Sequence, residues 1–456
     1  MWPGRPAEAL GKPIRQLVNQ RAVRWSKTVV LFMNAVIWRI LILALFLTAG
    51  CGASNSSPAS DGTWVGTITT EGNVTTVINE SGSVWGGTAT LVEEASIGVD
   101  AGADEYMLGE VSGIAATPNN IFVIDRQIPA VRVYDAHGVY QRDIGGPGQG
   151  PGEFQRPASI AIGTNGQIFL RDDGARRIWV YSQDGDYLHA YPMTGGINTS
   201  RPMALLVNDV PYTTVFVGLR TDDPYRVFDI AMQAHGSDGP YGDLIMQPVA
   251  DSFVPSVISS DDGSVQRPVP FSPREVWAMT ADLDVIFGVS RSYRFEVRRR
   301  AGSLLEVERS AALVAVDPDE AAWHRANATA IMRDIIPDWI WNGPEVADTK
   351  PLFHEFIPSA TGEIWVRRPG RGTPLPGCNQ AAESSAEFSG NPCWAEQNLV
   401  DVFGNDGRYL GAVDAPAEMQ FSPRPVIDGY NVVARTEDEA GTIMVKRYRL
   451  VLPGER

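Results

Sequence analysis

Two stretches, IFVIDRQIPAVRVYDAHGVY (121–140) and IFLRDDGARRIWVYSQDGDY (168–187), align without a gap at an offset of 47 residues. Asp125 coincides with Asp172, and a turn glycine and a tyrosine coincide near the end of each stretch. Both stretches read as short alternating strands joined by polar turns. The chain is therefore built from a repeated β unit.

Weaker copies of this unit follow along the chain. They occupy residues 214–232, 285–305, 363–368 with 399–410, and 430–451. Six units of short strands at a period of about 40 to 50 residues predict a β-propeller, in which each four-stranded blade buries its faces against its neighbours. A solenoid or a sandwich is the alternative. The last unit is one strand short, so we expect residues 88–99 to complete the last blade and close the ring.

The repeat motifs resemble the NHL-type repeats of six-bladed β-propeller lipoproteins of bacteria. The matching motifs are G-I-A (113–115), I-F-V-x-D (121–125), R-V-Y-D-x-x-G (132–138) and GxGPGEFxxP (148–157). The resemblance covers about 88–451. It implies that the last of these motifs connects the outer strand of one blade to the inner strand of the next.

The same connector, IGGPGQGPGEFQRP (144–157), contains enough glycine to suggest a phosphate-binding loop. Such a loop needs a helix immediately after it, because the helix N-terminus supplies the donors that bind phosphate. Strand-like alternation follows instead, in ASIAIG (158–163). We therefore interpret the glycines and prolines as turn residues.

Charge is distributed unevenly along the chain. The formal charge is −16, and residues 1–50 contribute +6 from seven Lys or Arg and one Glu, which leaves −22 on 51–456. A body this acidic makes nucleic acid an unlikely partner. The 44% of hydrophobic residues indicates a folded protein, and the 45 Gly and 32 Pro indicate that it is rich in turns.

The segment 1–50 is expected to be a lipoprotein signal. Residues 40–50 form an apolar run of signal-peptide length, and LTAGCG resembles a bacterial lipobox whose Cys51 is lipidated. Thr48 stands where the family prefers Leu. Initiation at Met33 would leave 1–32 untranslated, and an uncleaved anchor helix over 28–50 is the alternative. Gly52 after the cysteine implies the outer membrane, so we expect a lipid-anchored protein of the bacterial cell envelope.

The expected organisation follows from these features. Residues 51–62 are a flexible tether, 63–87 an N-terminal strand extension and 88–451 the propeller, with insertions at 233–270, 317–343 and 369–397. Asp317, Pro318 and Glu320 mark a helix start in the second insertion. In the third, Cys378 and Cys393 are predicted to form a disulfide in an oxidising compartment, with a metal site as the alternative.

All three insertions are expected on one face of the propeller, and that face is where binding is usually built. The ends of the second strands also meet there. They carry the candidate ligand-binding residues Arg126, Arg171, Asp172, Arg220, Arg367, Arg368 and Arg435. Converging arginines would hold a carboxylate, phosphate or sulfate. The alternative is that each arginine pairs with a neighbouring acid.

We therefore expect an envelope propeller that binds an anionic small molecule or an envelope protein through this face. The alternative is an enzyme of the metal-dependent lyase or lactonase type, and a structural component is a third reading. Enzymes of those types depend on calcium or zinc, and no such ligand set can be placed on these repeats. We predict no cofactor and no metal site, and the chain gives no catalytic residues.

Overall fold

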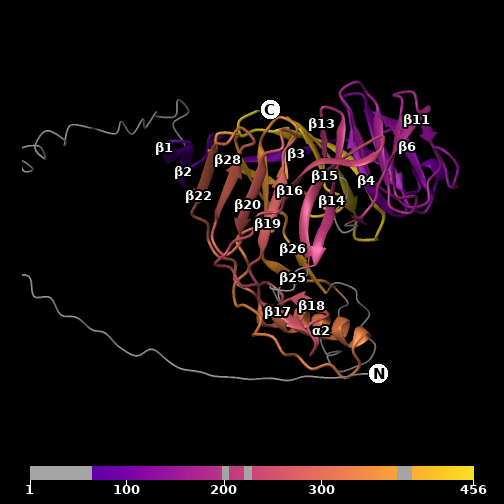
Figure 1. Cartoon of the computed structure of the whole chain (residues 1–456). Coiled ribbons are helices and arrows are strands. Elements are labelled where there is room, and N and C mark those ends of the chain that lie inside the picture. The colour runs from indigo at the N-terminus through magenta and orange to yellow at the C-terminus, as the bar shows by residue number, and fades with distance from the viewer. Residues whose placement is uncertain (1–63, 198–204, 220–227, 377–392, 456) are drawn as a thin grey trace, which may run out of the picture. The chain divides into compact units, whose positions relative to one another are not determined.

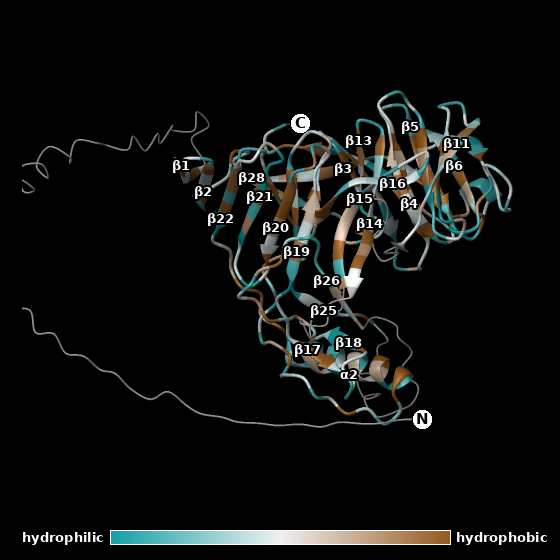
Figure 2. Ribbon diagram, viewed as in Figure 1, coloured by the Kyte–Doolittle hydropathy of each residue, from teal (hydrophilic) through white to brown (hydrophobic). Residues whose placement is uncertain are grey.

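The computed structural model describes residues 64–197, 205–219, 228–376 and 393–455. These residues form antiparallel blades with one helical insertion (Figure 1). The fold is a six-bladed β-propeller, as the repeat predicts. Hydrophobic residues concentrate in the strands and hydrophilic residues in the turns (Figure 2).

The first two blades are four-stranded sheets whose strands pair in chain order. The first comprises β4 (Val111–Ala116), β5 (Asn120–Asp125), β6 (Ala130–Asp135) and β7 (Tyr140–Ile144). The second comprises β8 (Pro157–Ile162), β9 (Ile168–Asp172), β10 (Arg177–Tyr181) and β11 (Tyr187–Pro192). The glycine-rich connector leads directly into β8, and its Phe154 is buried between these blades. The connector is therefore a turn and not a phosphate loop.

The third blade contains β14 (Val210–Leu219), β15 (Phe228–Gly236) and β16 (Gly239–Met246), with the short β12 (Gly196–Ile197) and β13 (Leu205–Val207) both pairing with β14. The expected insertion at 233–270 begins too early, because residues up to Met246 continue β15 and form β16. The glycines at 236 and 239 make a tight turn inside the blade. The insertion itself contains the hairpin of β17 (Val257–Ser259) and β18 (Gln266–Pro268).

The fourth blade is widened by the N-terminal extension. Its own strands are β19 (Glu275–Met279), β20 (Val285–Val289), β21 (Arg294–Arg298) and β22 (Leu304–Arg309). The strand β2 (Val74–Ser81) runs parallel to β22, and β1 (Val65–Glu71) pairs with β2.

The last two blades share one strand. The fifth contains β23 (Glu355–Pro358), β24 (Ile364–Arg368), β27 (Leu399–Phe403) and β28 (Tyr409–Asp414). The sixth contains β29 (Val426–Asp428), β30 (Asn431–Glu437) and β31 (Ile443–Val451). The strand β3 (Thr88–Ile97) pairs antiparallel with β31 and parallel with β28. The prediction that an N-terminal strand completes the last blade is confirmed.

The other insertions emerge on the same face as the β17–β18 hairpin. The helix α2 (Pro318–Ile335) begins as expected, with the Asp317 side chain accepting the N–H of Asp319. It packs against the β17–β18 hairpin through Met332, Ile258 and Val269. The third insertion contains the hairpin of β25 (Gly372–Pro374) and β26 (Trp394–Glu396). A single 3-10 turn, η1 (Asp104–Tyr106), precedes the first blade.

Candidate functional site

The insertion-bearing face has a repeated backbone contact. In three blades, the residue after the second strand donates its N–H to the carbonyl of the residue before the inner strand. We call these two residues the rim pair of a blade. The rim pairs are Glu110 and Arg126 in the first blade, Arg156 and Asp173 in the second, and Arg274 and Ser290 in the fourth.

In the first two blades, an aspartate at the end of the second strand accepts backbone N–H groups at the rim. Asp125 accepts the N–H groups of Gly109, Glu110 and Gln127, each at 3.0 Å. Asp172 takes the same position in the second blade. It accepts four N–H groups at 2.7 to 2.9 Å, from Gln155, Arg156, Gly174 and Ala175. These aspartates hold the connecting loops, since a carboxylate accepts several backbone donors strongly.

Four of the arginines predicted from the sequence have their own carboxylate partners. The pairs are Arg126 with Glu110 (2.6 Å), Arg171 with Asp173 (2.7 Å), Arg368 with Asp401 (3.3 Å) and Arg435 with Glu437 (2.6 Å). The sequence predicts Arg171 and Asp172 at the open channel mouth. In the structure both side chains are fully buried. Cys51, Arg220 and Cys378 lie outside the described residues, so the lipidation and disulfide predictions remain predictions.

Arg367 differs from those four arginines. Its guanidinium lies over the ring of Phe421, 4.6 Å from the ring centroid. Nearby, Arg274 donates from Nη2 to the carbonyl of His354 at 3.2 Å. Within the part of the chain that the structure describes, no carboxylate oxygen lies within 4.0 Å of either guanidinium. Arg274 and Arg367 thus both lie next to His354, and we call this cationic region the recess.

Sequence reasoning missed Arg274. Arg274 directly precedes an inner strand, whereas the residues predicted from the sequence lie at the ends of second strands. A difference at one repeat position could have indicated it. Ser290 donates the rim hydrogen bond in the fourth blade, whereas the charged residues Arg126 and Asp173 donate it in the first two blades. The Ser290 hydroxyl accepts the N–H of Arg274 at 2.9 Å, so the loop is still held, but without a negative charge.

The surroundings of Arg274 and Arg367 lower the pKa of both side chains. Burial lowers the pKa of Arg274, Glu355 opposes this shift, and Arg367 lowers it further. Burial likewise lowers the pKa of Arg367, although Glu355 and Glu396 raise it. Arg274 is nevertheless solvent exposed. Glu355 is itself engaged by Arg424 at 2.9 Å.

A buried ionic network lies behind the recess. The fully buried Lys350 contacts Glu320 of α2 and Glu396 of β26, both at 2.6 Å, and Nε2 of His354 lies 3.5 Å from Glu396. Burial raises the pKa of Glu396, but hydrogen bonds from His354 and Lys350 and the charge of Lys350 lower it to about 2. Two insertions are thereby joined to the fifth blade.

Charged side chains of both signs gather around the recess. Four cations, Arg274, Arg367, Lys350 and Arg424, lie among the carboxylates of Glu320, Glu355 and Glu396, and Glu275 lines the cavity beside Arg274. Burial lowers the pKa of His354, Glu396 raises it, and Arg274 and Arg367 lower it, so this side chain is neutral at pH 7.

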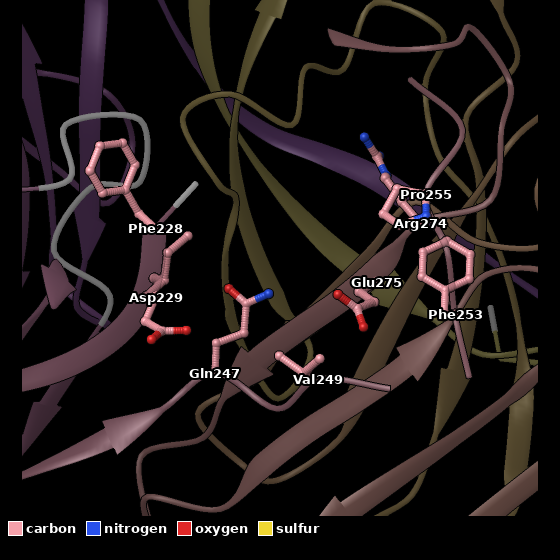
Figure 3. A pocket seen from close by; sticks show the side chains of 9 residues that line it. Phe228, Asp229, Gln247, Val249, Phe253, Pro255, Arg274 and Glu275 are labelled. Carbon is pink, nitrogen blue, oxygen red and sulfur yellow. The ribbon is translucent and has the colours of Figure 1, made fainter. Parts of the chain in front are cut away.

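A cavity of about 280 Å³ adjoins Arg274. Its lining residues come from the third and fourth blades and the loop between them: Phe228, Asp229, Ile230, Gln247, Val249, Phe253, Pro255, Arg274 and Glu275. In Figure 3, Phe228 and Asp229 approach from one side, Phe253 and Glu275 from the other, and Gln247 and Val249 lie between them. Arg274 therefore belongs to both the recess and this pocket.

Comparisons with known proteins find a family model for part of the chain and several solved structures of low sequence identity. Residues 102–193 match the family model DUF5128, described as a 6-bladed beta-propeller. A DUF4221 member from Bacteroides vulgatus is 8% identical, with 80% of this chain and 99% of that chain covered and a TM-score of 0.45. Virginiamycin B lyase from Staphylococcus aureus is 12% identical, with 80% and 95% covered and a TM-score of 0.32.

Regucalcin from Agrobacterium tumefaciens, a calcium-binding protein, is 11% identical, with 81% of this chain and 99% of that chain covered and a TM-score of 0.32. No curated protein sequence matches the chain. Among the described residues, no cluster of three or more His, Cys, Asp or Glu could bind a metal ion. No helix among the same residues has the length and apolarity needed to cross a membrane.

Proposed function

We propose that this propeller is a binding protein that captures an anionic ligand on its insertion-bearing face, between Arg274 and Arg367. The observation that carries the proposal is that neither guanidinium has a carboxylate within 4.0 Å among the described residues. By contrast, Arg126 on the first rim is paired with Glu110, and Arg171 beside the second rim is paired with Asp173.

Arginine suits this role because its planar fork can bind a carboxylate, phosphate or sulfate through two parallel hydrogen bonds. Burial lowers the pKa of both side chains, so a bound anion would relieve an existing electrostatic cost. Surrounding the recess is a body of charge −22, which repels anions elsewhere on the surface. A local positive site on such a body is selective for the groups that reach it.

The test is calorimetric titration with sulfate and citrate. Arg274→Gln and Arg367→Gln should each weaken binding roughly tenfold to a hundredfold, since a charge-assisted contact is worth about 1.5 to 3 kcal/mol. Arg156→Gln is the matched control, because Arg156 holds the rim position of Arg274 in the second blade. Binding that neither substitution weakens would contradict the proposal.

We also propose that the propeller is held at the bacterial cell envelope through lipidated Cys51, with the outer membrane as its destination. The support is the sequence alone, in the apolar run of 40–50 and the LTAGCG motif. Cys51→Ala should then accumulate as an unprocessed precursor. Wild-type protein that fractionates as soluble would contradict the anchor.

The disulfide between Cys378 and Cys393 belongs to the same proposal, because it requires an oxidising compartment. It would close a loop outside the blades. Two free thiols found by mass spectrometry under non-reducing conditions would exclude it.

A further inference from the structure

We infer that the pocket beside Arg274 binds the apolar group of the anion, so that the ligand is an acylated apolar amino acid with a free carboxylate. This inference rests on the proposed function, because the carboxylate would occupy the recess of Arg274 and Arg367. It adds the ligand's chemical class and orientation.

The pocket walls are suited to one apolar side chain. Phe228 and Phe253 lie on opposite sides of the cavity, and Val249 lies between them (Figure 3). A volume of about 280 Å³ is near the lower end of small-molecule sites, which run from about 300 to 1,000 Å³. A leucine or phenylalanine side chain fits such a space, whereas a large cofactor does not.

A polar group in the wall calls for a hydrogen-bond donor. The Oε1 atom of Gln247 is buried and has no hydrogen-bond partner in the described part of the chain. A buried acceptor without a partner costs free energy, and a ligand donor would recover it. The amide N–H of an acylated amino acid is such a donor. Acetate or a fatty acid would leave Oε1 unpaired.

The charges in the wall fix the orientation. Asp229 and Glu275 line the same cavity as Arg274, and Glu275 accepts the N–H of Ala250 at 2.7 Å. Among the residues that line the pocket, Arg274 is the one cation, so it favours an anionic group at its own end of the pocket. The ligand carboxylate therefore lies toward Arg274 and Arg367, the N–H toward Gln247, and the side chain between the two phenylalanines.

This chemistry has two sources, a free N-acyl amino acid and the C-terminal residue of a peptide. The experiment is titration with acetate, N-acetyl-L-phenylalanine, its carboxamide, and an uncharged-side-chain pentapeptide ending in phenylalanine. We expect N-acetyl-L-phenylalanine to bind about ten- to hundredfold more tightly than acetate, from burial of its side chain. The carboxamide should lose that affinity. A pentapeptide that binds more tightly than N-acetyl-L-phenylalanine identifies a peptide terminus, and equal affinity identifies the free compound.

Two variants test the pocket itself. Phe228→Ala removes one wall without disturbing the core, since its side chain is 46% exposed, and it should abolish the advantage over acetate. Gln247→Leu should reduce that advantage severalfold. Val254→Ala is the control, because Val254 is exposed and lies beside the lining residues without belonging to them.

The two proposals fail differently. If acetate and sulfate bind through Arg274 and Arg367 but N-acetyl-L-phenylalanine binds no better than acetate, the inference is overturned and the anion site remains. If neither arginine affects sulfate binding, the proposed function itself is overturned.

Discussion

The rim pairs of the first and fourth blades have the same backbone contact but different charges. In the first blade, Glu110 and Arg126 form both the backbone hydrogen bond and an ion pair at 2.6 Å. In the fourth, the equivalent Arg274 and Ser290 form the backbone bond and a second hydrogen bond, in which the Ser290 hydroxyl accepts the N–H of Arg274, but no ion pair. A repeat can therefore keep this backbone contact while the charges of both rim residues change.

The comparison separates residues that hold the scaffold from residues available to a ligand. Asp172 uses its carboxylate to accept four backbone N–H groups. Arg274 is open to solvent, and among the described residues neither it nor Arg367 has a carboxylate within 4.0 Å. The aspartate at the end of the second strand, which we predicted from the sequence as a ligand-binding residue, holds the connecting loops in the first two blades. The functional position lies in the blade that departs from the motif.

The largest effect is expected at the regular rim. Asp172→Ala leaves four backbone N–H groups without their acceptor at a fully buried site, so it should lower the free energy of unfolding by about 3 to 5 kcal/mol. Urea denaturation measures this change. Asp184→Ala, in an exposed turn of the same blade, should change it by less than about 0.5 kcal/mol. A loss below about 1 kcal/mol for Asp172→Ala would end the distinction between the two rims.

A smaller effect is expected when the fourth rim is made to resemble the others. Ser290→Asp places a carboxylate beside Arg274 and should weaken sulfate binding about tenfold, because the arginine acquires a partner from its own chain. Ser290→Asn has nearly the same size without the charge and should leave affinity within about twofold. Equal affinities of the Asp and Asn variants, measured by calorimetry, would show that the charge at this position is irrelevant.

The smallest effect concerns pH. His354 faces Arg274, Arg367 and Glu396, and its pKa lies below the ordinary value of 6.5. As the pH falls through that pKa, the ring gains a positive charge beside the recess, so sulfate should bind more tightly. The gain is about 1 kcal/mol, roughly fivefold. His354→Asn should flatten the profile between pH 7 and pH 5. A profile that instead weakens toward pH 5 would contradict the placement of the anion.

Much of the fold could be predicted from local patterns. The offset of 47 residues located the first two blades, and Asp317 with Pro318 located α2. The missing strand of the last repeat led to β3, which pairs with β31. The pairing of β2 with β22 had no local signal, because it joins segments more than 200 residues apart through backbone hydrogen bonds.

The site was less predictable, for a physical reason. An arginine is available only if no acid reaches it, and that depends on residues distant in the chain. Asp401 reaches Arg368 from another strand, and Glu396 of the third insertion is held by Lys350 and His354. Arg367 was identified from the sequence, but its freedom and its neighbour Arg274 were not.

The most direct measurement is anomalous diffraction from crystals of the full propeller soaked in selenate. We predict a selenium peak within hydrogen-bonding distance of both Arg274 and Arg367, and no comparable peak at Arg156. Both guanidinium groups bonded to carboxylates of the same chain, with no selenium peak between them, would contradict this prediction.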